Sequence, residues 1–76
     1  MDPYHELANA IIVQAVKDYR KALKYYFLRP QRPEYQQEVA ELERFFTSEW
    51  FQALSDLDGP SLMSRVRSMV RMEVSV

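Results

Sequence analysis

The residues that interrupt regular structure fall in only three places along this chain of 76 residues. Pro3 stands near the start, Pro30 and Pro33 lie close together, and the single glycine, Gly59, is followed by Pro60. Proline and glycine are the strongest local breakers of helices. The long stretches between them carry apolar residues at helical spacing. The pattern therefore predicts an all-α fold.

The first helix is expected to run from Pro3 to about Leu28. Asp2 fits an N-cap, and Pro3 fits the first helical position. A helical wheel places the apolar residues on one broad half, which is wider than one neighbouring helix needs. This helix is therefore expected to be the spine of the bundle, or to be covered in part by a second copy of the chain. Its apolar half holds Tyr4, Leu7, Ala8, Ile11, Ile12, Ala15, Val16, Tyr19, Ala22, Leu23, Tyr25 and Tyr26.

The rest of the chain predicts two or three shorter helices. Residues 29–32 form a turn, and Pro33 opens a second helix with an apolar stripe. Thr47 and Ser48 are good N-cap residues, so a short helix from Glu49 to Leu54 follows, unless the break is absent. The stripe of the second helix consists of Tyr35, Val39, Leu42 and Phe46.

A closing helix is expected after Gly59, because apolar residues again recur there at helical spacing. These residues are Leu62, Val66, Met69 and Val70. The tail from residue 72 to residue 76 is either frayed or a short extension. Together the segments predict a single helical domain over residues 1–76, a small three- to four-helix bundle with a long N-terminal helix.

Composition excludes several classes of protein. With no cysteine and one histidine, the chain has neither a disulfide framework nor the usual ligands of a zinc site, and no cofactor is expected. A single glycine excludes a glycine-rich phosphate loop, and no nucleophile constellation accompanies His5, so an enzyme is not expected. No apolar run reaches about 18 residues and no signal peptide is visible, which predicts a cytoplasmic protein without membrane attachment.

The net charge of −1 conceals a strong separation of charge. Residues 17–32 sum to +5 and residues 33–59 sum to −6. The cations of the first helix lie three and four residues apart, so they share one face and repel one another. Either the acidic side of the second helix neutralises them, or they bind an anionic partner such as nucleic acid. The candidate nucleic-acid-binding residues are Lys17, Arg20, Lys21 and Lys24, with Arg65, Arg67 and Arg71 as further candidates.

Acidic and aromatic residues form a second candidate surface. Glu34, Glu38 and Glu41 share one flank of the second helix with Phe45, and Trp50 and Phe51 follow closely. Large aromatic residues bury much area in a small core, which is one explanation of their abundance. The other is a protein-binding surface, because Trp and Tyr are enriched at binding hot spots. The second explanation makes Glu34, Glu38, Glu41, Phe45, Trp50 and Phe51 the candidate protein-binding residues.

Two stretches of the chain resemble a known group of proteins. They are NAIIVQAVKDYRKAL, from Asn9 to Leu23, and ERFFTSEWFQALSDLDG, from Glu43 to Gly59, and a helix led by Leu62 follows. The pattern is similar to small uncharacterised helical proteins of prophages and other mobile elements of Firmicutes. The resemblance implies a bacterial mobile-element origin. Short acidic helical proteins in that setting are often accessory factors, including inhibitors of host defence proteins.

Three hypotheses of function follow. The first is a non-enzymatic protein-binding accessory module of a phage or mobile element that binds a host or phage protein, such as a host defence protein that it inhibits. The second is a nucleic-acid-binding accessory protein that uses the basic face of the first helix. The third is a homodimer formed through the wide apolar arc of that helix.

Overall fold

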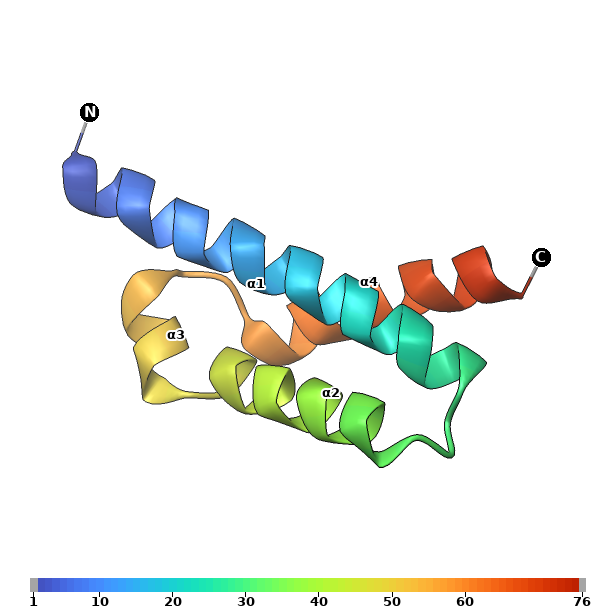
Figure 1. The fold of residues 1–76 in the computed structure, drawn as a ribbon. Coiled ribbons are helices and arrows are strands. Elements are labelled where there is room, and N and C mark those ends of the chain that lie inside the picture. Colours follow the sequence, from blue (N-terminus) through green and yellow to red (C-terminus); the bar gives the residue numbers. More distant parts are fainter. Residues whose placement is uncertain (1, 76) are drawn as a thin grey trace.

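The computed structural model describes residues 2–75 and contains four α-helices in that range. They are α1 (Pro3–Leu28), α2 (Pro33–Phe46), α3 (Glu49–Leu54) and α4 (Gly59–Val74). Figure 1 shows α2 running back alongside α1, while α4 starts near the C-terminal end of α2 and crosses behind α1, and α3 lies below the N-terminal half of α1. The predicted all-α bundle with a long N-terminal helix is confirmed, and no strand occurs among the described residues.

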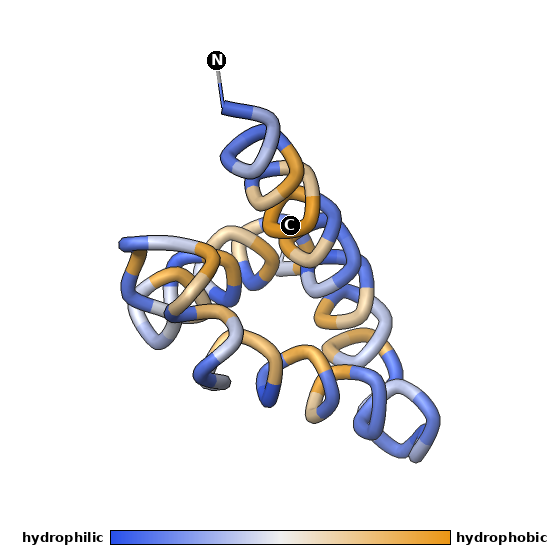
Figure 2. The backbone as a smooth tube through the Cα atoms, turned by 90° about the vertical axis from the view of Figure 1, so that its left-hand side faces the viewer, coloured by the Kyte–Doolittle hydropathy of each residue, from blue (hydrophilic) through white to orange (hydrophobic). Residues whose placement is uncertain are grey.

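Helix α1 is the spine of the bundle, because it packs against both α2 and α4. Its start matches the expected cap, since the Asp2 carboxylate accepts a 3.0 Å hydrogen bond from the backbone N–H of Tyr4. The hydrophobic segments of α1 and α2 face one another in Figure 2. At the other end of the chain α4 continues to Val74, so the tail is a helical extension to that point; Val76 lies outside the described residues.

The core lies where α1, α2 and α4 meet, with one contribution from α3. Its largest fully buried side chains are Tyr19, Leu23, Phe46, Phe51 and Val70. Phe51 is 0% exposed, and its ring packs edge-on against Phe46 at 5.5 Å. This corrects the prediction that Phe51 belongs to a contact surface. Phe51 is the one fully buried side chain of α3, and it joins this short helix to the bundle.

The turn between α2 and α3 is held by Ser48. Its hydroxyl donates a 2.6 Å hydrogen bond to the carbonyl of Phe45 and accepts a 3.1 Å bond from the N–H of Phe51. An N-cap of this kind satisfies a backbone donor that the first turn leaves unpaired. The expected break after α2 is therefore present, and it sets the direction of α3.

The turn between α3 and α4 brings α4 into close contact with α2. Asp58 caps α4 by accepting a 3.2 Å hydrogen bond from the N–H of Ser61. The next residue, Gly59, is buried, and a Cβ at this position would lie 1.9 Å from the carbonyl oxygen of Phe46. Only glycine allows this approach of one backbone to another.

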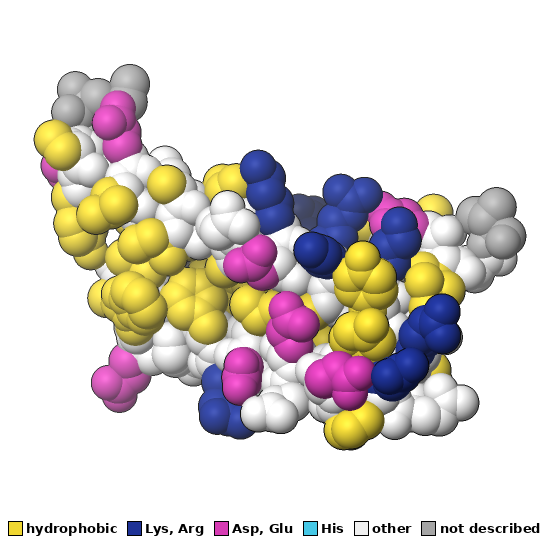
Figure 3. Space-filling model, viewed as in Figure 1, with side chains coloured by type: hydrophobic (Ala, Val, Ile, Leu, Met, Phe, Trp, Pro, Cys, Tyr) yellow, Lys and Arg dark blue, Asp and Glu magenta, His cyan; other side chains and the backbone are white. Residues whose placement is uncertain are grey.

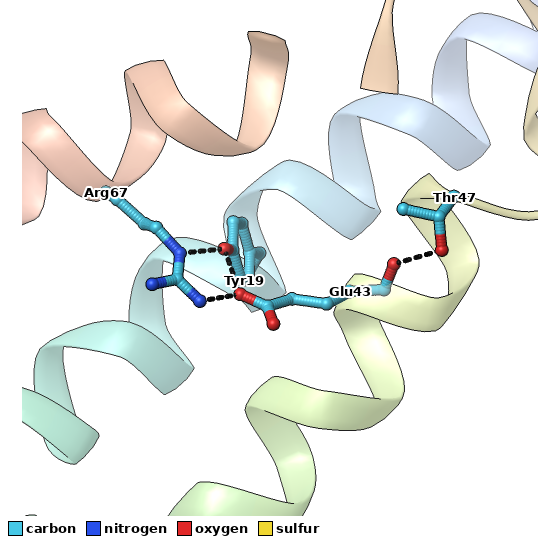
Figure 4. A network of polar contacts seen from close by, with 4 residues as sticks. All are labelled: Tyr19, Glu43, Thr47 and Arg67. Carbon is cyan, nitrogen blue, oxygen red and sulfur yellow. Dashed lines mark hydrogen bonds and ion pairs between the residues drawn. The ribbon is translucent and has the colours of Figure 1, made fainter. Parts of the chain in front are cut away.

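One polar network joins the three long helices (Figure 4). Tyr19 of α1 donates a 2.7 Å hydrogen bond to Glu43 of α2, and Nε of Arg67 in α4 donates a 2.9 Å bond to the Tyr19 hydroxyl. Arg67 also forms an ion pair with Glu43. Arg67 is thus engaged with Tyr19 and Glu43, while 38% of its side chain stays exposed.

The network shifts the pKa of each of its three members. Burial, and then the hydrogen bond to Glu43, raise the pKa of Tyr19 to about 12 from its ordinary value of 10.0. Burial alone would raise the pKa of Glu43, but hydrogen bonds from Arg67 and Tyr19 outweigh it and lower that pKa. The hydrogen bond to Glu43 is the main cause that raises the pKa of Arg67. The network therefore favours a neutral tyrosine beside a charged pair.

Candidate functional site

An apolar groove opens between α1, α2 and α3. Its volume is about 440 Å³. Figure 3 shows hydrophobic side chains gathered into one patch over this region, below the N-terminal half of α1. We call this feature the apolar groove. Its lining residues are Ala10, Ile11, Gln14, Ala15 and Asp18 from α1, Leu42 and Phe45 from α2, and Trp50 from α3.

Trp50 forms the outer wall of the apolar groove and is 59% exposed. Its ring meets the half-buried ring of Phe45 edge-on, with centroids 5.5 Å apart and an interplanar angle of 82°. Phe45 is itself held against the buried Phe46 and Phe51. Tryptophan is among the residues that are enriched at hot spots of protein interfaces.

Carboxylates border the apolar groove at one end. Asp18 lines the groove beside Leu42, and it accepts a 3.0 Å hydrogen bond from the side chain of Gln14. Glu38 and Glu41 precede Leu42 by one turn or less on α2, and both are exposed. We call Asp18, Glu38 and Glu41 the acidic strip. None of the ion pairs formed among residues 2–75 involves these three residues.

The structure distributes the predicted protein-binding residues over three environments. Phe45 and Trp50 line the apolar groove, whereas Glu38 and Glu41 do not line it and are exposed on α2, within one turn of Leu42. Glu34 is exposed in the first turn of α2, where it forms an ion pair with Arg32 at 3.5 Å. Phe51 is in the core and takes no part in the surface.

Sequence reasoning missed the α1 side of the groove. Ile11 and Ala15 fall within the broad apolar half of α1 that was expected to be covered, and both are only half-buried. Asp18 was counted as one acid within a basic segment. The width of the apolar arc was the one signal that could have indicated them, because α2 and α4 cover only part of it.

The predicted basic residues lie together on the outer side of α1. Lys17, Arg20, Lys21 and Lys24 line a shallow hollow of about 330 Å³ with Tyr25 and Glu73. Arg20 forms an ion pair with Glu73 of α4. Among the described residues, no ion pair joins this basic hollow to Glu34, Glu38 or Glu41. The acidic side of α2 therefore does not neutralise the basic face by direct pairing.

Residues 2–75 contain no group of three or more His, Cys, Asp or Glu side chains that could hold a metal ion. His5 lies 3.6 Å from Asp2 at the exposed start of α1. The pKa shifts described above belong to the network of Tyr19, Glu43 and Arg67, which supports the bundle and lines none of the pockets described above.

Comparison of the chain with protein-family models, with curated proteins and with solved structures finds no significant match. The resemblance to mobile-element proteins stays a prediction from sequence. Within the described part of the chain, no helix is long and apolar enough to cross a membrane.

Proposed function

We propose that this chain is a non-enzymatic protein-binding module, and that the apolar groove receives a cationic amphipathic segment of a partner protein. The observation that carries the proposal is Trp50, which is 59% exposed at the edge of an apolar groove bordered by carboxylates. Burial of the indole and of the groove lining would supply the free energy of binding. The acidic strip would select a positively charged partner and speed its approach.

A second copy of the chain fits this groove less well than a cationic partner does. Two copies related by a two-fold axis through the groove would place the same surface against itself. With the axis along the groove, Asp18 and Glu41 of both copies would meet, and like charges in such positions are unfavourable. With the axis across the groove, these carboxylates would face Leu7 and Ile11 of the other copy, which supply no opposite charge. The resemblance to mobile-element proteins suggests a biological setting, an accessory factor of a phage or mobile element that inhibits a host defence protein.

The proposal is tested by capturing partners from a bacterial lysate with the tagged full-length chain and three variants. Trp50→Ala removes the wall of the groove. Leu57→Ala is the matched control, because Leu57 is 56% exposed and does not line the groove. Ile11→Glu places a charge on the groove floor.

Support requires one stoichiometric protein that wild type and Leu57→Ala retain and that Trp50→Ala and Ile11→Glu lose. A partner that binds all four proteins equally would contradict the proposal. So would self-association that Trp50→Ala abolishes, since the occupant would then be a second copy, and so would the absence of any partner.

A second candidate function is nucleic-acid binding through the basic hollow. The observation in its favour is that four cations, Lys17, Arg20, Lys21 and Lys24, line one concave surface on α1. Contacts of this kind bind phosphates with strong salt dependence. A gel shift at low salt with single- and double-stranded DNA tests it. Binding that the double variant Lys17→Glu/Lys21→Glu leaves unchanged would exclude the basic hollow.

A further inference from the structure

We infer that the segment bound in the apolar groove is an α-helix that carries its apolar anchors and its lysine or arginine residues about two turns apart on the same face. This inference rests on the proposed function and specifies its ligand. It follows from the position of the acidic strip relative to the groove. The strip lies at one end of the groove, toward the C-terminus of α1.

The carboxylates of α1 and those of α2 lie toward the same end of the groove. On α1, Asp18 follows Ile11 by seven residues; on α2, Glu41 and Glu38 precede Phe45 by four and seven residues. Because α2 runs antiparallel to α1, going forward from Ile11 on α1 and going back from Phe45 on α2 lead to the same end of the groove (Figure 1). An α-helix rises 1.5 Å per residue, so seven residues correspond to roughly 10 Å along the groove.

The opposite end of the groove continues as an apolar surface. Leu7 lies one turn before Ile11 on α1 and is 61% exposed. The exposed surface along this face therefore changes from apolar at Leu7 and Ile11 to acidic at Asp18. A bound segment must match that order, with apolar side chains at one end and cations at the other.

The separation of roughly 10 Å favours a helical ligand over an extended one. In a helix this distance spans about seven residues, and residues seven apart lie on the same face. In a strand the same distance spans about three residues, and residues three apart point to opposite faces. Only the helical segment presents its anchors to Ile11 and Trp50 and its cations to Asp18 and Glu41 from a single face.

The test is a selection of random 16-residue peptides displayed on phage, with the full-length chain as target and Trp50→Ala as counter-target. The expected binders carry apolar residues at i and i+3 or i+4, and lysine or arginine about seven residues before or after the central anchor. They are expected to become helical on binding, as measured by circular dichroism. A synthetic peptide is then compared with a permuted peptide of the same composition, in which the cations are moved to the opposite face of the helix from the anchors.

The permuted peptide is expected to bind about fivefold more weakly or worse, since exposed charge pairs contribute up to about 1 kcal/mol each. Glu38→Gln/Glu41→Gln should weaken the selected peptide by a similar factor and leave the permuted peptide unaffected. Glu6→Gln, an exposed acid of α1 outside the groove, is the matched control and should change neither.

Two failures are distinguishable. Peptides that depend on Trp50 but show no cationic bias, or no helix on binding, would overturn this inference and leave the proposed function standing. If no selected peptide depends on Trp50, the inference and the groove-based function both fall.

Discussion

The hydroxyl of Tyr19 donates a 2.7 Å hydrogen bond to Glu43 from inside the core, where the Tyr19 side chain is fully buried. Arg67 completes the contact from α4 by donating to the same hydroxyl. Every polar atom of this buried phenol is therefore satisfied, and no buried side-chain nitrogen or oxygen among residues 2–75 lacks a partner. The network links three helices that are far apart in sequence.

Replacing Tyr19 by phenylalanine should destabilise the protein by about 1 to 2 kcal/mol. The substitution keeps the ring in the core but removes one donor from Glu43 and one acceptor from Arg67. Urea unfolding followed by circular dichroism measures the loss. Tyr4→Phe is the control, because Tyr4 is exposed, and it should change stability by less than about 0.5 kcal/mol. Equal effects of the two variants would show that the Tyr19 hydroxyl contributes nothing to the free energy of unfolding.

The same network predicts loss of stability at both ends of the pH scale. The pKa of Tyr19 is about 12 in the folded protein and 10.0 ordinarily, so the unfolded chain loses this proton first as pH rises. The contribution of Tyr19 is therefore complete below pH 10 and is lost between about pH 10 and 12. The pKa of Glu43 is lowered, so its contribution is present above its ordinary value of 4.5 and is lost as pH falls below it.

Unfolding curves measured across pH for wild type, Tyr19→Phe and Glu43→Gln test the direction of both changes in stability. Tyr19→Phe should lose less stability than wild type on the alkaline side, and Glu43→Gln should lose less on the acid side. Parallel pH profiles for the three proteins would refute the assignment.

Gly59→Ala should destabilise the protein by about 1 to 3 kcal/mol, because its Cβ would overlap the carbonyl oxygen of Phe46. In an unobstructed helix the same change stabilises, since alanine has the higher helix propensity. Ser64→Ala, at an exposed position of α4, is the matched control and should be neutral or slightly stabilising. A stabilising effect of Gly59→Ala in thermal unfolding would mean that α4 does not approach α2 as closely as described.

The neighbouring aromatic residues Trp50 and Phe51 should respond in opposite ways to truncation. Trp50→Ala should cost less than about 1 kcal/mol of stability, because the indole is 59% exposed, yet it should abolish partner binding. Phe51→Ala should cost about 3 to 5 kcal/mol, because it empties part of the core. Chemical unfolding and the peptide-binding assay, applied to both variants, separate the two roles. Similar stability losses would contradict this division.

The helix boundaries could be predicted from sequence because their signals are local. Asp2 and Pro3 mark the start of α1, Pro33 marks the start of α2, and Ser48 marks the start of α3, as the structure has them. Caps and prolines act within one turn of the backbone, so they can be recognised without knowledge of the tertiary fold.

The roles of Glu43, Phe51 and Arg67 could not be predicted in the same way. Glu43 resembles the other acids of α2, and only the meeting of three helices makes it the partner of Tyr19 and Arg67. The choice between Phe51 and Trp50 as the buried ring depends on the rotation of α3 that the turn at Ser48 sets. Sequence reasoning thus singled out Phe45, Trp50 and Phe51 but could not tell which of these rings is buried in the core.

The six-residue length of α3 has a consequence for how the Trp50 wall behaves in solution. A helix so short does not persist without tertiary support, and one fully buried side chain, Phe51, supplies most of that support. Its amide protons should therefore exchange with deuterium well before those in the middle of α1, since local opening needs less free energy than global unfolding. The two sides of the apolar groove should thus differ in local stability, with the α1 side the more protected and the α3 side the first to open.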